Sequence, residues 1–201
     1  MVVTQTSSLP SPSVQAQVEA LTAVAKRLSS EGKEAQALEA YKTASGLMPG
    51  APWLQHRTAE LARKLKQPEA ATLHYRRAAA AFISAGFPKR ALGPLRTGWQ
   101  VCIALLPGDA GGFIAIALEL ANVQRELGFA ADAKLTLTNS NQALRASGSS
   151  ERVPSSADFE ARATRPPAAE GTEPPQSGVK ASATPAPSNG FFSRLQAAVK
   201  P

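Results

Sequence analysis

A pattern of small and aromatic residues recurs 34 positions apart in the first half of this 201-residue chain. The first copy has Ala25, Ala37, Tyr41 and Ala44 where the second copy has Ala59, Ala71, Tyr75 and Ala78. Small residues at helical spacing let two antiparallel helices approach closely, and each tyrosine fills the gap between one helix pair and the next. A repeat of this length predicts an array of helical hairpins that share a continuous core. Such arrays present an extended surface, so the pattern favours recognition over catalysis.

Further residues extend the pattern in residues 18–51, and with them the chain resembles the tetratricopeptide repeat family. They are Leu21, Val24, Leu28, Gly32 and Pro49. The second copy, residues 52–85, keeps the alanines and the tyrosine but has Lys66 where the family usually has glycine. The resemblance implies an all-α fold: a short helical-hairpin array of about seven helices in three to four repeats, flanked by disordered tails.

A shorter pattern of alanine, glycine and alanine marks three of the turns between expected helices. It occurs around Gly32, Gly86 and Gly128, and its second copy begins on the helix that closes residues 52–85. One helix therefore serves two successive pairs. Apolar periodicity and the Gly and Pro stops predict helices at about 13–30, 33–47, 53–66, 68–85, 88–106, 112–127 and 130–145. We expect Pro94 to kink or break the start of the fifth helix, and a run of Asn and Ser to fray the last.

The two ends of the chain differ in composition from the array at residues 13–147. Residues 1–12 are predicted to be a disordered tail, and residues 148–188, rich in Pro, Ala and Ser, a disordered linker. Residues 189–201 predict a short amphipathic helix. Its docking side chains are Phe191, Phe192, Leu195 and Val199, with Arg194 beside them. So short a helix is expected to form only on docking, and the array itself, a membrane surface and a partner remain alternative docking sites.

Cysteine content and hydropathy indicate the compartment. The first residues lack a basic start followed by an apolar run, which argues against a secretion signal. No apolar stretch approaches the length of a membrane span. The chain has one cysteine, Cys102, so a disulfide within it is excluded and a reducing environment fits. We expect a cytoplasmic protein, with a peripheral position at the inner face of the membrane as the alternative.

Positive charge is concentrated in the middle of the chain. Residues 57–96 contain nine Lys and Arg but only two Glu, an excess of +7 that equals the net charge of the whole chain. One explanation is that these residues form an ordinary solvated face of the helices. The alternative is that they form a functional patch that attracts an acidic peptide or an anionic membrane surface. Nucleic acid is disfavoured, because aromatic residues make up 5% of the chain and no stacking platform accompanies the charges.

Catalytic motifs are missing from the sequence. The two histidines, His56 and His74, are 18 residues apart on different expected helices, with no cysteine or carboxylate at metal-ligand spacing. Neither a nucleophile elbow nor a phosphate-binding loop accompanies them. The sequence therefore predicts a non-enzymatic protein without a metal or cofactor.

The family resemblance also implies where a partner binds, because the first helix of each pair lines the groove in that family. The implied groove residues are Lys26, Ser29, His56, Arg57, Glu60, Arg63, Lys64, Asn122 and Arg125. The leading hypothesis is a protein-binding scaffold or adaptor that holds a segment of a protein or peptide on this groove, and the positive charge favours an acidic segment. The alternatives are a membrane-targeting adaptor that docks through residues 189–201, and a chaperone for secreted substrates.

Overall fold

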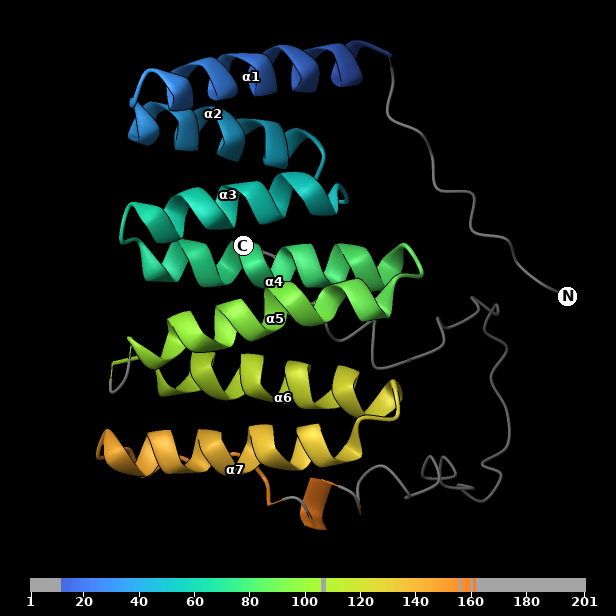
Figure 1. Ribbon diagram of the computed structural model, residues 1–201, viewed down its shortest axis with the longest axis vertical. Helices are drawn as coiled ribbons and strands as arrows, with labels where there is room; N and C mark the ends of the chain where they lie inside the picture. Colours follow the sequence, from blue (N-terminus) through green and yellow to red (C-terminus); the bar gives the residue numbers. More distant parts are fainter. Residues whose placement is uncertain (1–11, 106–107, 156, 160, 162–201) are drawn as a thin grey trace, which may run out of the picture. The chain divides into compact units, whose positions relative to one another are not determined.

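The computed structural model describes residues 12–105, 108–155, 157–159 and 161, and every regular element in this part of the chain is a helix. The chain divides into two compact units between Val153 and Pro154, and the first unit contains the array. Its helices are α1 (Pro12–Ser30), α2 (Glu34–Leu47), α3 (Pro52–Lys64), α4 (Pro68–Ser84), α5 (Pro88–Ile103), α6 (Ala110–Glu126) and α7 (Ala130–Ala146). The prediction of an all-α array of seven helices is therefore confirmed (Figure 1).

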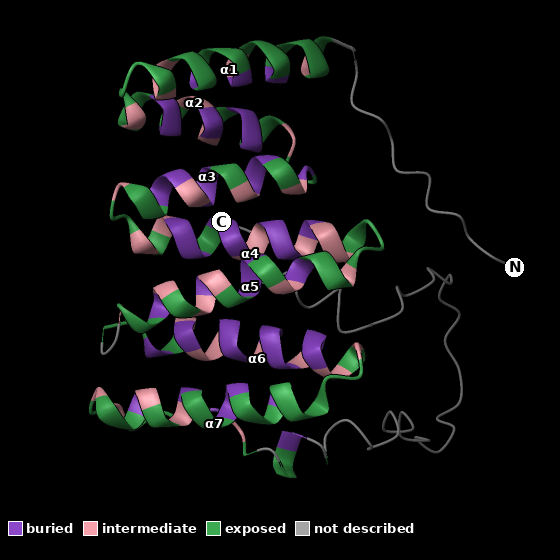
Figure 2. Ribbon diagram, in the orientation of Figure 1, coloured by how far each residue is buried: buried purple, intermediate pink, exposed green. Residues whose placement is uncertain are grey.

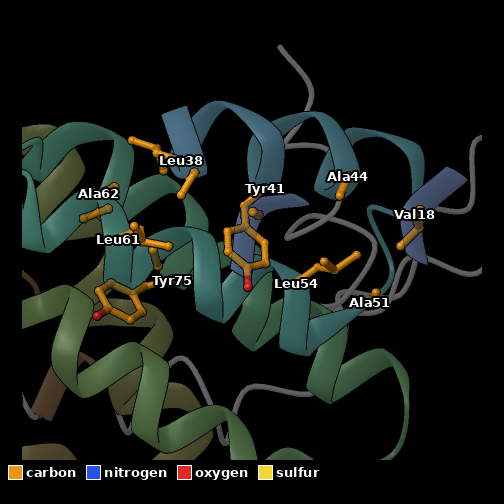
Figure 3. Close-up of a cluster of buried hydrophobic side chains, with 13 residues drawn as sticks. Val18, Leu38, Tyr41, Ala44, Ala51, Leu54, Leu61, Ala62 and Tyr75 are labelled. Carbon is orange, nitrogen blue, oxygen red and sulfur yellow. The ribbon is translucent and has the colours of Figure 1, made fainter. Parts of the chain in front are cut away.

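Each helix packs antiparallel against the helices before and after it in the sequence (Figure 1). Helix α4 packs extensively against both α3 and α5, as expected for a helix shared by two pairs. The inward sides of the helices form a buried stripe through the stack (Figure 2). Tyr41 and Tyr75, the two repeated tyrosines, are among the largest buried side chains (Figure 3). They fill the space between successive helices, which small residues such as Ala37 and Ala71 allow to approach closely.

The tight turns between hairpin helices share one geometry. In each turn a residue with positive φ follows the helix, and the next N–H bonds to a carbonyl five residues back, as in Lys33 N to Leu28 O at 2.9 Å. This arrangement satisfies carbonyls that the helix end leaves without partners. The positive-φ residues between helices are Gly32, Lys66, Gly86 and Gly128. The recurring glycines of the sequence thus mark turns, and Lys66 takes the same conformation without being glycine.

Replacing Lys66 with glycine is expected to stabilise the array by about 0.5–1 kcal/mol. At φ +56° a side chain strains the backbone, and relief of that strain outweighs the greater entropy that glycine has in the unfolded chain. The reciprocal change, Gly32→Lys, is expected to destabilise by a similar amount, because Gly32 has φ +74°. Urea unfolding of both variants measures the two effects, and a loss of stability in Lys66→Gly would contradict this account of the turn.

Helix α5 does not break where the sequence predicts. It runs without interruption from Pro88 to Ile103 with the buried Pro94 inside it, so a broken first turn at Pro94 is wrong. A proline at this position removes the N–H that would bond to the carbonyl of Arg90. Because Arg90 is exposed, water can reach that carbonyl and the helix continues.

The folded array extends beyond the end of α7. Asn141 bonds to both backbone groups of Val153, accepting from its N–H at 3.0 Å and donating to its carbonyl at 3.2 Å. Val153 itself is 3% exposed. Residues 148–153, which follow the predicted end of the array at 147, therefore return to α7 and belong to the same compact unit as the array. The side chain of Asn141 thus satisfies backbone groups of a segment that belongs to no helix. Ser140 beside it is buried, and α7 continues to Ala146 without the predicted fraying.

Several predictions fall on residues that are not described. The described residues do not include residues 1–11, residues 162–188 of the predicted linker, or the predicted docking helix at 189–201. The predictions for Phe191, Phe192, Arg194, Leu195 and Val199 therefore stay predictions. Within the described residues, no helix is both long and apolar enough to cross a membrane.

Candidate functional site

Helix α3 presents a continuous outward surface, which we call the α3 face. Pro52 occupies its first turn, where the missing N–H of proline breaks no helical bond. Leu54, Ala59 and Ala62 point into the core. The α3 face consists of the side chains after Pro52 that are exposed or half-buried: Trp53, His56, Arg57, Glu60, Arg63 and Lys64. Five of these six were predicted as groove residues, and the structure brings those five together on one helix.

Trp53 belongs to the α3 face but was not among the predicted residues. Its side chain is 52% exposed, which is unusual for so large an aromatic residue. It lies three and four positions before His56 and Arg57, a spacing that places all three on the same side of a helix. The spacing can be seen in the sequence, but apolar periodicity alone assigns a tryptophan to the buried side of a helix.

Glu60 organises the middle of the α3 face. Arg57 Nη1 donates to Glu60 Oε2 at 3.0 Å, and His56 Nε2 lies 3.5 Å from Glu60 Oε1. The His56 ring also packs edge-on against Tyr75, with 5.7 Å between ring centroids. Its Nδ1 atom is buried without a hydrogen-bond partner among the described residues. The carboxylate therefore balances part of the positive charge and fixes the orientation of two neighbours.

Interactions between the repeated tyrosines and the two arginines of the α3 face influence the pKa values of Arg57 and Tyr75. Hydrogen bonds from Arg57 to Glu60 and to Tyr41 raise the pKa of Arg57. Burial raises the pKa of the Tyr75 hydroxyl, and a hydrogen bond with Arg63 partly offsets this. Tyr41 belongs to α2 and Tyr75 to α4, so helices on both sides of α3 contribute to the electrostatics of its arginines.

Lys64 forms an ion pair with a residue of another helix rather than with one of its own helix. Its ammonium group meets the carboxylate of Glu34, at the start of α2. The lysine side chain is 68% exposed. Exposed pairs of this kind contribute about 0–1 kcal/mol, so an anionic ligand can replace Glu34 at little cost.

The other predicted groove residues lie on different helices. Lys26 and Ser29 are near the carboxyl end of α1, which runs in the same direction as α3 (Figure 1). Asn122 accepts a hydrogen bond from Arg125 at 3.2 Å, but both lie on α6. Helices α4 and α5 separate α6 from α3 in the stack (Figure 1). The structure thus leaves the α6 pair apart from the α3 face.

The basic excess of residues 57–96 is smaller in space than in sequence. Three of its nine cations pair with carboxylates from outside that segment: Lys64 with Glu34, Arg76 with Glu119, and Arg96 with Asp132. These three carboxylates lower the excess from +7 to +4. Sequence reasoning overestimated the patch because partners distant in the sequence could not be counted.

A buried polar network supports α3 from behind. Gln55, 1% exposed, donates to the carbonyl of Ser45 at 3.2 Å, and its Oε1 lies 2.8 Å from His74 Nδ1. Because a carbonyl oxygen only accepts, His74 carries its proton on Nδ1. Burial, with the charges of Arg77 and Lys42, lowers the pKa of His74 to about 4. His74 is therefore a structural histidine that is neutral at physiological pH.

His74 predicts a loss of stability in mild acid. The unfolded chain takes up a proton on this side chain below its ordinary pKa of 6.5, whereas the folded chain does so only near 4. Stability therefore falls as the pH drops through this window, by about 2 kcal/mol between pH 7 and pH 5. Urea unfolding at both pH values tests this, with His74→Gln as the variant that removes the titration. An equal loss in the wild-type protein and in His74→Gln would contradict the assignment.

Among the described residues, His, Cys, Asp and Glu form no group of three that could hold a metal ion. Burial raises the pKa of the Cys102 thiol, which lies 3.3 Å from the Thr72 hydroxyl. Cys102 is thus poorly suited to act as a nucleophile.

Comparisons with known proteins give no assignment. No protein-family model matches the chain, and no curated protein matches it either. The architecture and the α3 face must therefore support the functional interpretation by themselves.

Proposed function

We propose that this protein is a non-enzymatic, tetratricopeptide-like scaffold that binds a segment of a partner protein on the α3 face. The observation that carries the proposal is the composition of that face. One helix presents an exposed tryptophan, two arginines and a lysine, and its opposite side is locked into the core. Tryptophan and arginine are the residues that most often dominate binding energy at protein interfaces.

The rigidity of the α3 face supports this role. Arg57 donates to Glu60 at 3.0 Å, and the His56 ring packs against the buried Tyr75 with 5.7 Å between ring centroids. Side chains that are ordered before binding lose less conformational entropy in the complex. The face therefore resembles a prepared interface more than an array of freely solvated charges.

The chemistry of the α3 face favours a partner segment that combines carboxylates with an apolar side chain. Arg57, Arg63 and Lys64 outnumber the negative charge of Glu60 on the face. Arginine can grip a carboxylate with two parallel hydrogen bonds. Trp53, one turn before Arg57, offers an apolar contact beside these donors. We therefore expect an acidic segment with an aliphatic or aromatic residue next to its acidic side chains.

Reversing the three cations to glutamate is expected to abolish partner capture. The triple variant Arg57→Glu, Arg63→Glu, Lys64→Glu changes side chains that are exposed, so the helical content stays the same. Quantitative mass spectrometry of proteins captured from native lysate measures the effect. The matched control reverses Arg27, Lys134 and Arg145, three exposed cations on α1 and α7. Capture that survives the triple reversal, or is lost equally in the control, would refute the proposal.

A further inference from the structure

One edge of the helical array carries every exposed aromatic side chain that the structure describes. These are Trp53, Phe87 and Phe129, with exposed fractions of 52%, 50% and 44%. They lie at the α2–α3, α4–α5 and α6–α7 turns, and Figure 1 shows these three turns along the same edge of the stack. All other Phe, Trp and Tyr residues in the described part of the chain are buried or half-buried. We call this set, with Lys89 and Arg90, the aromatic edge.

The exposure of these aromatics results from the turn geometry. Phe87 and Phe129 each follow a glycine with positive φ, and the N–H of each bonds to a carbonyl five residues back, at 2.9 and 2.8 Å. This bond fixes the backbone so that the residue stands at the tip of the turn, between two helices. About half of each phenylalanine therefore stays exposed, at equivalent positions of two turns on the same edge.

Positive charge stands beside the central aromatic residue. The guanidinium carbon of Arg90 lies 5.0 Å from the centre of the Phe87 ring, and Lys89 is exposed next to it. The α2–α3 turn and the helix ends beside it, residues 47–53, contain no charged residue. Near Phe129, the carboxylate of Asp132 is paired with Arg96 at 3.5 Å, so its negative charge is balanced in part.

We propose that the aromatic edge docks on an anionic membrane surface. Aromatic side chains favour the membrane–water interface, where their rings reach the acyl boundary while polar groups stay hydrated. Lysine and arginine beside them gain energy from anionic lipid headgroups. A lipid surface needs no complementary pocket, so it can accept aromatics on separate turns at once.

A protein partner fits the aromatic edge less well. The aromatic hot spots of protein interfaces cluster in one desolvated pocket. Here each aromatic is on a different turn, and two helices separate one turn from the next. At about 8–10 Å per packed helix, neighbouring turns are about 16–20 Å apart. A flat surface reaches all three without such a pocket.

Vesicle co-sedimentation of the full chain tests the proposal, with phosphatidylcholine vesicles that contain or lack phosphatidylserine. We expect binding to the anionic vesicles that weakens with salt. The double variant Phe87→Ser, Phe129→Ser is expected to weaken it by about tenfold or more. Neutralising Lys89 and Arg90 to glutamine is expected to weaken it by about fivefold per charge. Neither variant touches the α3 face, so capture of the protein partner should persist.

Matched controls change the same kinds of side chain elsewhere. Leu73→Ser with Ile103→Ser removes two apolar side chains, each 40% exposed, and Lys66→Gln with Arg145→Gln removes two exposed charges. Both controls are expected to bind anionic vesicles like the wild-type protein. Should the serine variant lose helical content, Phe87→Trp with Phe129→Trp provides a second measurement, since tryptophan at both tips is expected to preserve binding.

Three results would overturn the proposal. They are a wild-type protein that does not bind anionic vesicles, binding that is unchanged in the edge variants, and binding that falls equally in the matched controls. The second result is also the one expected if residues 189–201 alone hold the chain to the membrane, or if the edge binds a protein. The edge is therefore tested separately from that C-terminal segment and from the α3 face.

Discussion

Replacing Arg76 with alanine is expected to lower the free energy of unfolding by about 3–5 kcal/mol, the largest effect we predict for a single side chain. Arg76 on α4 donates to Glu119 on α6 through Nε, at 3.0 and 3.1 Å to the two carboxylate oxygens, and Nη2 contacts the same carboxylate. The side chains are only 16% and 9% exposed. Removing the guanidinium would leave a charged carboxylate buried without its partner.

The electrostatics of Arg76 support this expectation. Burial by itself lowers the pKa of the guanidinium, but the hydrogen bond and charge of Glu119 outweigh it and raise the pKa. Arg96→Ala provides a matched control, because Arg96 pairs with Asp132 at 3.5 Å with both side chains about half exposed. That change is expected to cost about 0–1 kcal/mol. Urea unfolding compares the two, and similar losses would show that burial of the Arg76 pair has no energetic consequence.

Gly98→Ala is expected to destabilise the array by about 1–3 kcal/mol because three helices meet at this position. A Cβ atom on Gly98 would lie 2.6 Å from Ile116 Cδ1 on α6 and 3.1 Å from Tyr75 Cβ on α4. The end of Ile116 can rotate away, but Tyr75 Cβ is attached directly to the α4 backbone. Helices α4 and α5 would therefore have to move apart.

Gly93 on the same helix supplies the control. A Cβ atom there meets nothing within 4 Å outside its own helix, but the ring of Pro94 disfavours a Cβ on the residue before it. This clash offsets the gain in helix propensity, so Gly93→Ala is expected to change stability by less than about 1 kcal/mol. The two Gly→Ala variants of α5 are thus expected to differ in the size of their effect, with a loss of about 1–3 kcal/mol at Gly98 and a change of less than about 1 kcal/mol at Gly93. Melting temperatures of both reveal the difference, and equal shifts would contradict the close crossing at Gly98.

The helices and their turns could be predicted from the sequence because both are local. Spacing of apolar residues marks the buried side of each helix, and Gly32, Gly86 and Gly128 mark turns that need positive φ. The repeated Tyr41 and Tyr75 identify the positions that fill the core. Grouping of His56, Arg57, Glu60, Arg63 and Lys64 on one helix follows from their spacing alone.

What the sequence did not show depends on contacts between distant residues. Arg76 and Glu119 are 43 positions apart, so the basic stretch was expected to be more positive than the structure makes it. The return of residues 148–153 depends on the side chain of one residue, Asn141, which matches both backbone groups of Val153. The alignment of Phe87 and Phe129 on one edge depends on the stacking order of the helices and not on any motif.

Site-specific photo-crosslinking in living cells tests the central claim, that the α3 face binds a partner protein, most directly. Benzoylphenylalanine in place of Arg57 reports on the α3 face, and the same group in place of the exposed Glu69 on α4 reports on a surface outside it. We predict a protein adduct of defined mass from position 57 that is missing from position 69 and disappears in the background of Arg63→Glu with Lys64→Glu. Adducts of equal yield from both positions, or none from position 57, would contradict it.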